Sequence, residues 1–225
     1  MTVPLPLFPL GTVLFPGLVL PLKVFEERYR ALMRDLLAQP ADVTREFGVV
    51  AIERGLEVGP DISSVTLFPV GCTAEIRQVT AHDDGRFDLV TVGRRRFRIA
   101  ELIDADTPYA QAQVDFLAEP PDSDGAADRL APRALAAFRT YLRLIRTDAE
   151  DVAEQLPEDP TVLSNLIAAT AALTTADRQH LLAAPDTASR LRAELTLLHR
   201  EIVLLDQVRA VPVPISELPV KPGPN

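Results

Sequence analysis

Residues 76–92, IRQVTAHDDGRFDLVTV, contain the clearest local signal in the chain. Asp84-Gly85 separates two stretches that are rich in apolar and β-branched residues, which predicts a β-hairpin with arms at 76–81 and 86–92. We expect a type I′ turn, because both of its central positions need a positive φ, which Asp and Gly tolerate.

Further strands are predicted on both sides of this hairpin, because eight of the 10 glycines precede residue 100 and supply turns between short strands. A helix is predicted at 23–37, where an apolar stripe recurs at three- and four-residue steps (Phe25, Tyr29, Leu32, Met33, Leu36). The expected strands are 12–20 (interrupted at 15–17), 47–52, 65–79 (one strand or a pair, bent near Pro69 and Gly71), 94–102 and 109–117. Many short strands with one inserted helix are typical of a small, partly closed barrel.

The second half of the chain has helical periodicity, so the fold class is α+β. Helices are predicted around 135–145, from Pro160-Thr161, over 175–182, and from Pro185-Asp186 onward. The apolar stripe of the helix that starts at Pro160-Thr161 includes Leu163, Leu166, Ile167 and Leu173. In the helix that follows Pro185-Asp186, the apolar residues are spaced by 4, 3, 4 and 3 positions (Leu191, Leu195, Leu198, Ile202, Leu205). This last stripe fits packing within the chain's own bundle or a dimer seam, and the sequence leaves both open.

Composition divides the chain into four parts. Residues 1–117 are β-rich, 118–125 (AEPPDSDG) form a linker, 126–210 are helical, and 211–225 form a proline-rich extended tail. The net charge of −9 makes general binding to nucleic acid or anionic membranes unfavourable. Prolines within the uncharged residues 1–22 argue against a signal peptide or membrane anchor. We expect a soluble, cytoplasmic protein.

The sequence offers no convincing catalytic set, and we expect no catalytic residue, metal or cofactor. Lys23 and Lys221 are the only lysines, and neither completes a phosphate-binding loop or promises the burial that a Ser–Lys dyad needs. The single cysteine, Cys72, rules out a disulfide framework and follows Gly71 in a strand, a poor setting for a nucleophile. The histidines, His82, His180 and His199, are interpreted as surface residues; a His/Asp metal site at 82–84 is the weaker alternative.

One basic cluster, GRRRFRI at 93–99, stands out in this acidic chain. On a regular strand Arg94, Arg96 and Arg98 would share one face and form a rail for an anion or an acidic peptide. The alternative is a solvated sheet face on which these arginines pair with carboxylates such as Glu75, Glu101 or Asp115.

The opening LPLFPLGTVLFPG at 5–17 resembles the N-terminal signature of the Lon substrate-binding domain. The resemblance continues through LPLKVFEERY at 20–29, FGVV at 47–50, VGCTAEI at 70–76, the Asp84-Gly85 hairpin and VGRRRFRI at 92–99. It implies a PUA-like β pseudo-barrel followed by a helical bundle. In full-length Lon proteases this region engages unfolded or tagged proteins and passes them to an ATPase and a Ser–Lys peptidase. Neither module is in this sequence, which resembles the stand-alone proteins of this type.

The resemblance and the missing chemistry together favour a non-catalytic module that binds exposed apolar or extended polypeptide segments. Site candidates, placed at a shallow apolar groove near residues 15–17 and the first helix, are Phe15, Arg28, Tyr29, Arg96 and Tyr109. Phe15 and Tyr29 also suit a core role. The alternative is a regulatory or assembly protein, monomer or homodimer, that dimerises or docks on a separate protease through its C-terminal helices. An undetected hydrolase is a third, minor hypothesis.

Overall fold

A computed structural model describes residues 2–40, 42–55, 65–145 and 156–210, with only the backbone of 208–210. The first half of this described chain holds the strands and one helix: β1 (Val3–Leu10), β2 (Val19–Val24), α1 (Glu27–Leu37), β3 (Glu46–Arg54), β4 (Thr66–Leu67), β5 (Val70–Ala81), β6 (Phe87–Ile103) and β7 (Gln111–Phe116). The second half is helical: α2 (Ala126–Ile145), α4 (Pro160–Thr170), α5 (Thr175–Leu182) and α6 (Thr187–Ala210). The α+β expectation is confirmed.

The strands form one mixed sheet that bends into an unevenly closed ring. Neighbouring strands run in the order β1-β7-β6-β5-β3-β4, and a parallel pairing of β1 with β3 brings the two ends together. The β2 strand lies outside this order, and among the described strands its partner is the first part of β6. Phe97 fills the space inside the ring, where Gly48 and Gly71 leave room that a Cβ atom would take.

Prolines determine how β1 changes partner, and this strand was not predicted from the sequence. Residues 3–6 pair with β7 and residues 7–10 pair with β3. Backbone N–H groups alternate in direction along a strand, and the Leu7 N–H donates to Ala110 O at 2.8 Å on the β7 side. Pro4 and Pro6 therefore face away from β7, and Pro9 faces away from β3, so no ladder bond is lost.

The predicted hairpin is confirmed, but its turn is not type I′. Gly85 has a φ of 81°, and no non-glycine residue among those described has a positive φ. The His82 N–H donates to Arg86 O, and the Gly85 N–H donates to His82 O, which gives a three-residue loop ending in a left-handed glycine. The strands expected at 86–92 and 94–102 are one continuous strand, the 17-residue β6.

The segment before the first helix differs from the prediction. Residues 12–18 form no strand, β2 begins at Val19, and α1 begins at Glu27. Phe25 therefore lies outside the helix and its side chain is 57% exposed, whereas Tyr29, Leu32, Met33 and Leu36 are buried as expected. Pro21, which precedes the predicted helix, lies within the edge strand β2.

The helices of the second half pack on one another around a core of small and apolar side chains. Leu191, Leu195 and Leu198 of α6 are buried there together with Phe138 and Leu142 of α2. This packing agrees with the first interpretation of the α6 stripe, in which it packs within the chain's own helical bundle. The α4 helix ends at Thr170, so Leu173 lies beyond it.

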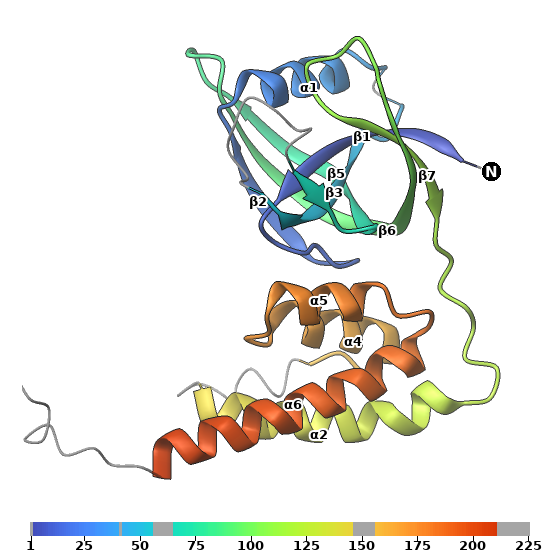
Figure 1. Cartoon of the computed structure of the whole chain (residues 1–225), viewed down its shortest axis with the longest axis vertical. Helices are drawn as coiled ribbons and strands as arrows, with labels where there is room; N and C mark the ends of the chain where they lie inside the picture. The colour runs from blue at the N-terminus through green and yellow to red at the C-terminus, as the bar shows by residue number, and fades with distance from the viewer. Residues whose placement is uncertain (1, 41, 56–64, 146–155, 211–225) are drawn as a thin grey trace, which may run out of the picture.

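Figure 1 shows α5 directly beneath the sheet ring, with α2 and α6 on its far side. The Gln179 side chain of α5 donates to Val70 O of β5 at 2.8 Å, and Leu181 and Leu182 enter the core beneath the sheet. None of the helices within the described ranges is long and apolar enough to cross a membrane. The tail predicted at 211–225 lies outside the described residues.

Candidate functional site

Three neighbouring hollows surround β2, and we call their combined lining the β2 surface. One, of about 210 Å³, lies between the end of β1, β2 and the start of α1. The second, of about 360 Å³, lies between the end of β2 and the β5–β6 hairpin. The third, of about 340 Å³, spans β2, β6 and β5. Lys23 lines all three hollows, and Phe25 lines the first two.

Aromatic and charged side chains shape the first hollow. The Phe8 and Tyr29 rings stack with their centroids 3.9 Å apart. The Arg28 guanidinium lies 4.6 Å from the centroid of the Tyr29 ring and pairs with Glu26 at 2.8 Å. The hollow therefore offers apolar surface with charges at its rim, a combination that suits extended polypeptide better than a small polar substrate.

The outer edge of β2 offers main-chain groups as well. Within the described residues no strand pairs with this edge. Proline is tolerated inside a strand only where its missing N–H faces away from the ladder, which is where Pro21 lies in β2. Exposed edges of this kind add extended peptides by main-chain hydrogen bonding.

Of the five predicted site residues, the structure places one, Tyr29, in the lining of the β2 surface, and Arg28 lies against the Tyr29 ring. Phe15 is fully buried. Its carbonyl oxygen packs against Gly93, because a Cβ atom at position 93 would lie only 2.1 Å from that oxygen. The Tyr109 hydroxyl donates to Asp35 Oδ2 at 2.7 Å, and neither residue lines the β2 surface. Burial, assisted by that carboxylate, raises the pKa of Tyr109 to about 12.

Arg96 joins the two halves of the molecule. Its Nη1 donates to the carbonyl oxygens of Leu182 and Ala184 at the end of α5, at 2.9 and 2.5 Å. Its Nη2 pairs at 2.7 Å with Glu119, whose other oxygen accepts from Arg190 of α6 at 2.7 Å. Burial lowers the pKa of Arg96, and the Glu119 carboxylate opposes this shift.

The predicted arginine rail is wrong, because a β-bulge interrupts the alternation. Arg94 and Arg95 together lie opposite Thr73, so both are exposed, and Arg96 turns inward. Arg94 pairs with Glu75 at 3.0 Å, as the alternative interpretation expected. Arg95 pairs with Glu46 and covers the Phe116 ring at 3.7 Å from its centroid.

Sequence reasoning missed Lys23 and Phe25 as members of the β2 surface. Lys23 was considered only as a catalytic base, and Phe25 was assigned to the apolar stripe of the helix. The available signal was Pro21 within an otherwise largely apolar stretch at 19–25, because a proline inside a strand-like segment indicates an edge strand.

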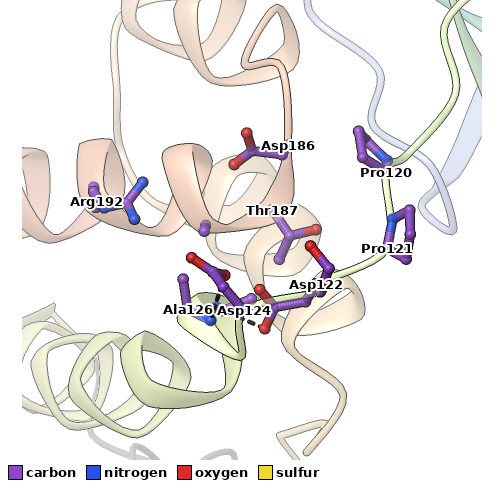
Figure 2. A pocket seen from close by; sticks show the side chains of 11 residues that line it. Pro120, Pro121, Asp122, Asp124, Ala126, Asp186, Thr187 and Arg192 are labelled. Atoms are coloured by element: carbon purple, nitrogen blue, oxygen red, sulfur yellow. Dashed lines mark hydrogen bonds between the residues drawn. The ribbon is translucent and has the colours of Figure 1, made fainter.

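A fourth hollow, of about 300 Å³, lies where residues 120–124 meet the starts of α2 and α6. Figure 2 shows Asp122, Asp124 and Asp186 around it, with Arg192 on α6. Each of these acids already accepts from the backbone at a helix start: Asp122 from Ala127, Asp124 from Ala126, and Asp186 from Ser189. These carboxylates act as helix caps.

Catalytic and metal chemistry find little support among the described residues. Burial raises the pKa of the Cys72 thiol to about 12, so it is a poor nucleophile. His82 bonds Asp88 across the hairpin at 2.9 Å. No group of three or more His, Cys, Asp or Glu that could hold a metal ion occurs in the described ranges.

The chain is similar to proteins of one known family. The family model of the "ATP-dependent protease La (LON) substrate-binding domain" matches residues 4–200. The chain belongs to this family. The Lon resemblance seen in the sequence is therefore confirmed.

Relatives of this Lon family chain are longer proteins. It is 32% identical to Lon protease 2 of Herpetosiphon aurantiacus, over 91% of this chain and 25% of that protein. It is 28% identical to the Lon protease of Escherichia coli K12, over 89% of this chain and 25% of that protein. The chain thus spans about a quarter of the curated relatives that it matches.

Two solved structures are similar along most of the Lon family chain. A Lon N-terminal domain protein from Xanthomonas campestris is 25% identical with a TM-score of 0.58, covering 86% of this chain and 98% of that one. The N-terminal domain of a Mycobacterium avium complex Lon protease has a TM-score of 0.65 over 88% of this chain and 98% of that one. At 20% identity the second match shows the fold alone.

Proposed function

We propose that this chain is a non-catalytic module that binds exposed apolar or extended polypeptide segments at the β2 surface. Membership of the Lon substrate-binding family supports polypeptide binding in general. The observation that carries the proposal is the exposed Phe25 ring beside the free edge of β2, between two hollows. The hollows would take side chains, and the edge would take main-chain hydrogen bonds.

The proposal includes an interpretation of the parts of the chain. In this interpretation the PUA-like pseudo-barrel (1–117) carries the binding surface. The linker (118–125) leads to the helical bundle (126–210), which packs against the pseudo-barrel and supports it. Among the five predicted site residues, Tyr29, which lines the first hollow, and Arg28, which lies against the Tyr29 ring, are proposed to contact polypeptide. Phe15, Arg96 and Tyr109 have buried or bonded positions that support the fold around it.

Phe25→Ser tests the proposal, with Leu102→Ser as its matched control. Both side chains are 57% exposed, but Leu102 lies near the far end of β6. Because burying a large apolar side chain contributes about 1.5–3 kcal/mol, Phe25→Ser should weaken binding of a reduced, alkylated, permanently unfolded protein by roughly 10- to 100-fold. The dissociation constant is measured by fluorescence anisotropy.

Leu102→Ser should bind like the unmodified chain. An equal loss in both variants would place the binding elsewhere, and no binding by the unmodified chain to any unfolded protein tested would reject the function. The alternative, assembly through the C-terminal helices, has less support, because Leu191, Leu195 and Leu198 already pack in the chain's own helical core.

A further inference from the structure

Most of the charged side chains around the β2 surface already have partners. Three contacts engage them: Glu26 with Arg28 at 2.8 Å, Asp88 with His82 at 2.9 Å, and Asp84 with Arg86 at 2.7 Å. Glu26 and Asp88 are the carboxylates that line the hollows, so both acids of the lining are engaged with groups of this chain.

Lys23 is the exception among these charges. It is exposed on β2 and lines all three hollows. Among the described residues, none forms an ion pair or a hydrogen bond with its ammonium group. The residue opposite it on β6 is Asp88, whose carboxylate bonds with His82 instead. The β2 surface therefore has an unpaired positive charge where its hollows meet.

Exposed apolar side chains lie before and after Lys23 along the chain. Phe25 follows it by two positions and is 57% exposed, and Val19 precedes it on the same strand and is 62% exposed. In an extended polypeptide, side chains two positions apart lie on the same face. A segment that runs along β2 would thus place one side chain opposite Lys23 and another, two positions away, against Phe25.

We propose that the β2 surface selects polypeptide segments in which an acidic side chain lies two positions from a large apolar one, and that Lys23 binds the acid. The inference rests on the proposed function, because it names the class of segment that the same surface takes. It concerns an Asp or Glu within the segment rather than a carboxylate at a chain end. The hollows extend from Lys23 both toward α1 and toward β5, which leaves room for chain on each side of the acid.

The net charge of −9 does not oppose this selection at contact distance. At physiological salt the Debye length is about 8 Å, so exposed charges elsewhere on the molecule are largely screened. An exposed ion pair adds little affinity, and burial of apolar side chains supplies most of the binding. Lys23 therefore determines which apolar segments are preferred rather than how tightly apolar segments bind in general.

Two unfolded Gly/Ser-rich peptides test the inference. Each is acetylated and amidated, so that its ends carry no charge, and each has a central charged residue with a Phe two positions away on either side. The central residue is Asp in one peptide and Lys in the other. Fluorescence anisotropy gives both dissociation constants, and the quantity compared is the constant of the Lys peptide divided by that of the Asp peptide.

Lys23→Gln should lower this ratio by about threefold to tenfold, because the attraction for Asp and the repulsion of Lys are both lost. Lys23→Glu should lower it further. Arg133→Gln is the matched control, since it also removes one positive charge from an exposed side chain, on α2. The ratio in this control should equal that of the unmodified chain.

The outcomes separate this inference from the proposed function. An unchanged ratio in Lys23→Gln, or an equal fall in Arg133→Gln, would overturn the selection of acidic segments. If the ratio does not respond to Lys23 but Phe25→Ser still weakens binding of both peptides, the selection is rejected and the function stands. If neither peptide nor any permanently unfolded protein binds the unmodified chain, both proposals are rejected.

Discussion

At the scale of single residues, the hairpin tip depends on a glycine for two separate reasons. Gly85 has a φ of 81°, and a Cβ there would lie 1.9 Å from Arg30 Nη2. The Arg30 side chain of α1 donates to Gly85 O at 2.7 Å and to Asp84 O at 3.2 Å. This contact attaches the helix to the hairpin, so the glycine supports both the turn and the docking of α1.

Gly85→Ala should therefore destabilise the fold more than Gly17→Ala. Gly17 has the same φ of 81°, but nothing lies within 4 Å of a Cβ at that position. Gly17→Ala should cost about 1 kcal/mol of backbone strain, and Gly85→Ala about 2–3 kcal/mol, because the Arg30 hydrogen bonds are also lost. Urea unfolding measures both free energies. Equal losses would mean that the Arg30 contact contributes nothing.

Cys72 makes stability depend on pH in the alkaline range. Burial raises the pKa of its thiol from 9.0 to about 12, so above pH 9 the unfolded chain releases this proton while the folded chain keeps it. The unfolded state is then favoured, and stability falls as the pH rises from 9 towards 12, by up to about 1.4 kcal/mol per pH unit.

Cys72→Ala removes this thiol and should have a flatter stability profile than the unmodified chain between pH 9 and 10.5. Chemical denaturation at several pH values gives both profiles, and only their difference is assigned to the thiol, since other groups titrate in both chains. Identical slopes would show that the thiol titrates normally in the folded chain.

At the scale of elements, the sequence predicts best where a local pattern and its surroundings agree. The hairpin, β3 and the helices α2, α4 and α5 have apolar periodicity and end signals that tertiary packing does not override. A proline does not by itself indicate which element it belongs to, because proline is tolerated both at the start of a helix and in an edge strand. That is why β1 was missed and Phe25 was assigned to a helix.

The candidate site was predicted less well than the fold, for a physical reason. A bulge opposite Thr73 determines which arginines of β6 face solvent and which face inward. No local residue pattern predicts this bulge. One extra residue moves Arg96 from a solvent-exposed rail to a buried contact with α5. The free edge of β2 depends likewise on which strands pair, which is settled by contacts distant in sequence.

At the scale of the whole molecule, one carboxylate forms ion pairs with both the sheet ring and the helices. Glu119 lies between Arg96 of β6 and Arg190 of α6, whose side chains are only 3% and 0% exposed. Thr187 Oγ1 also donates to it at 2.7 Å, and Arg190 Nε donates to Ser164 Oγ at 2.9 Å. Both buried guanidinium groups therefore pair with the same carboxylate, which adds to the other hydrogen bonds between the ring and the helices.

Glu119→Gln keeps the shape of this side chain and removes its charge, so both buried guanidinium groups lose the carboxylate with which they form ion pairs. Breaking a buried ion pair from one side is strongly destabilising, so we expect a loss of about 3 kcal/mol in the free energy of unfolding. Glu27→Gln is the matched control, because Glu27 also pairs with two arginines, Arg30 and Arg34, but is 65% exposed. Solvent screens that pair, and stability should hardly change. If the two variants had the same urea midpoint of unfolding, the Glu119 ion pairs would contribute no more to stability than an exposed pair. The contact between the ring and the helices would then be stabilised by its other interactions, such as the apolar packing around α5.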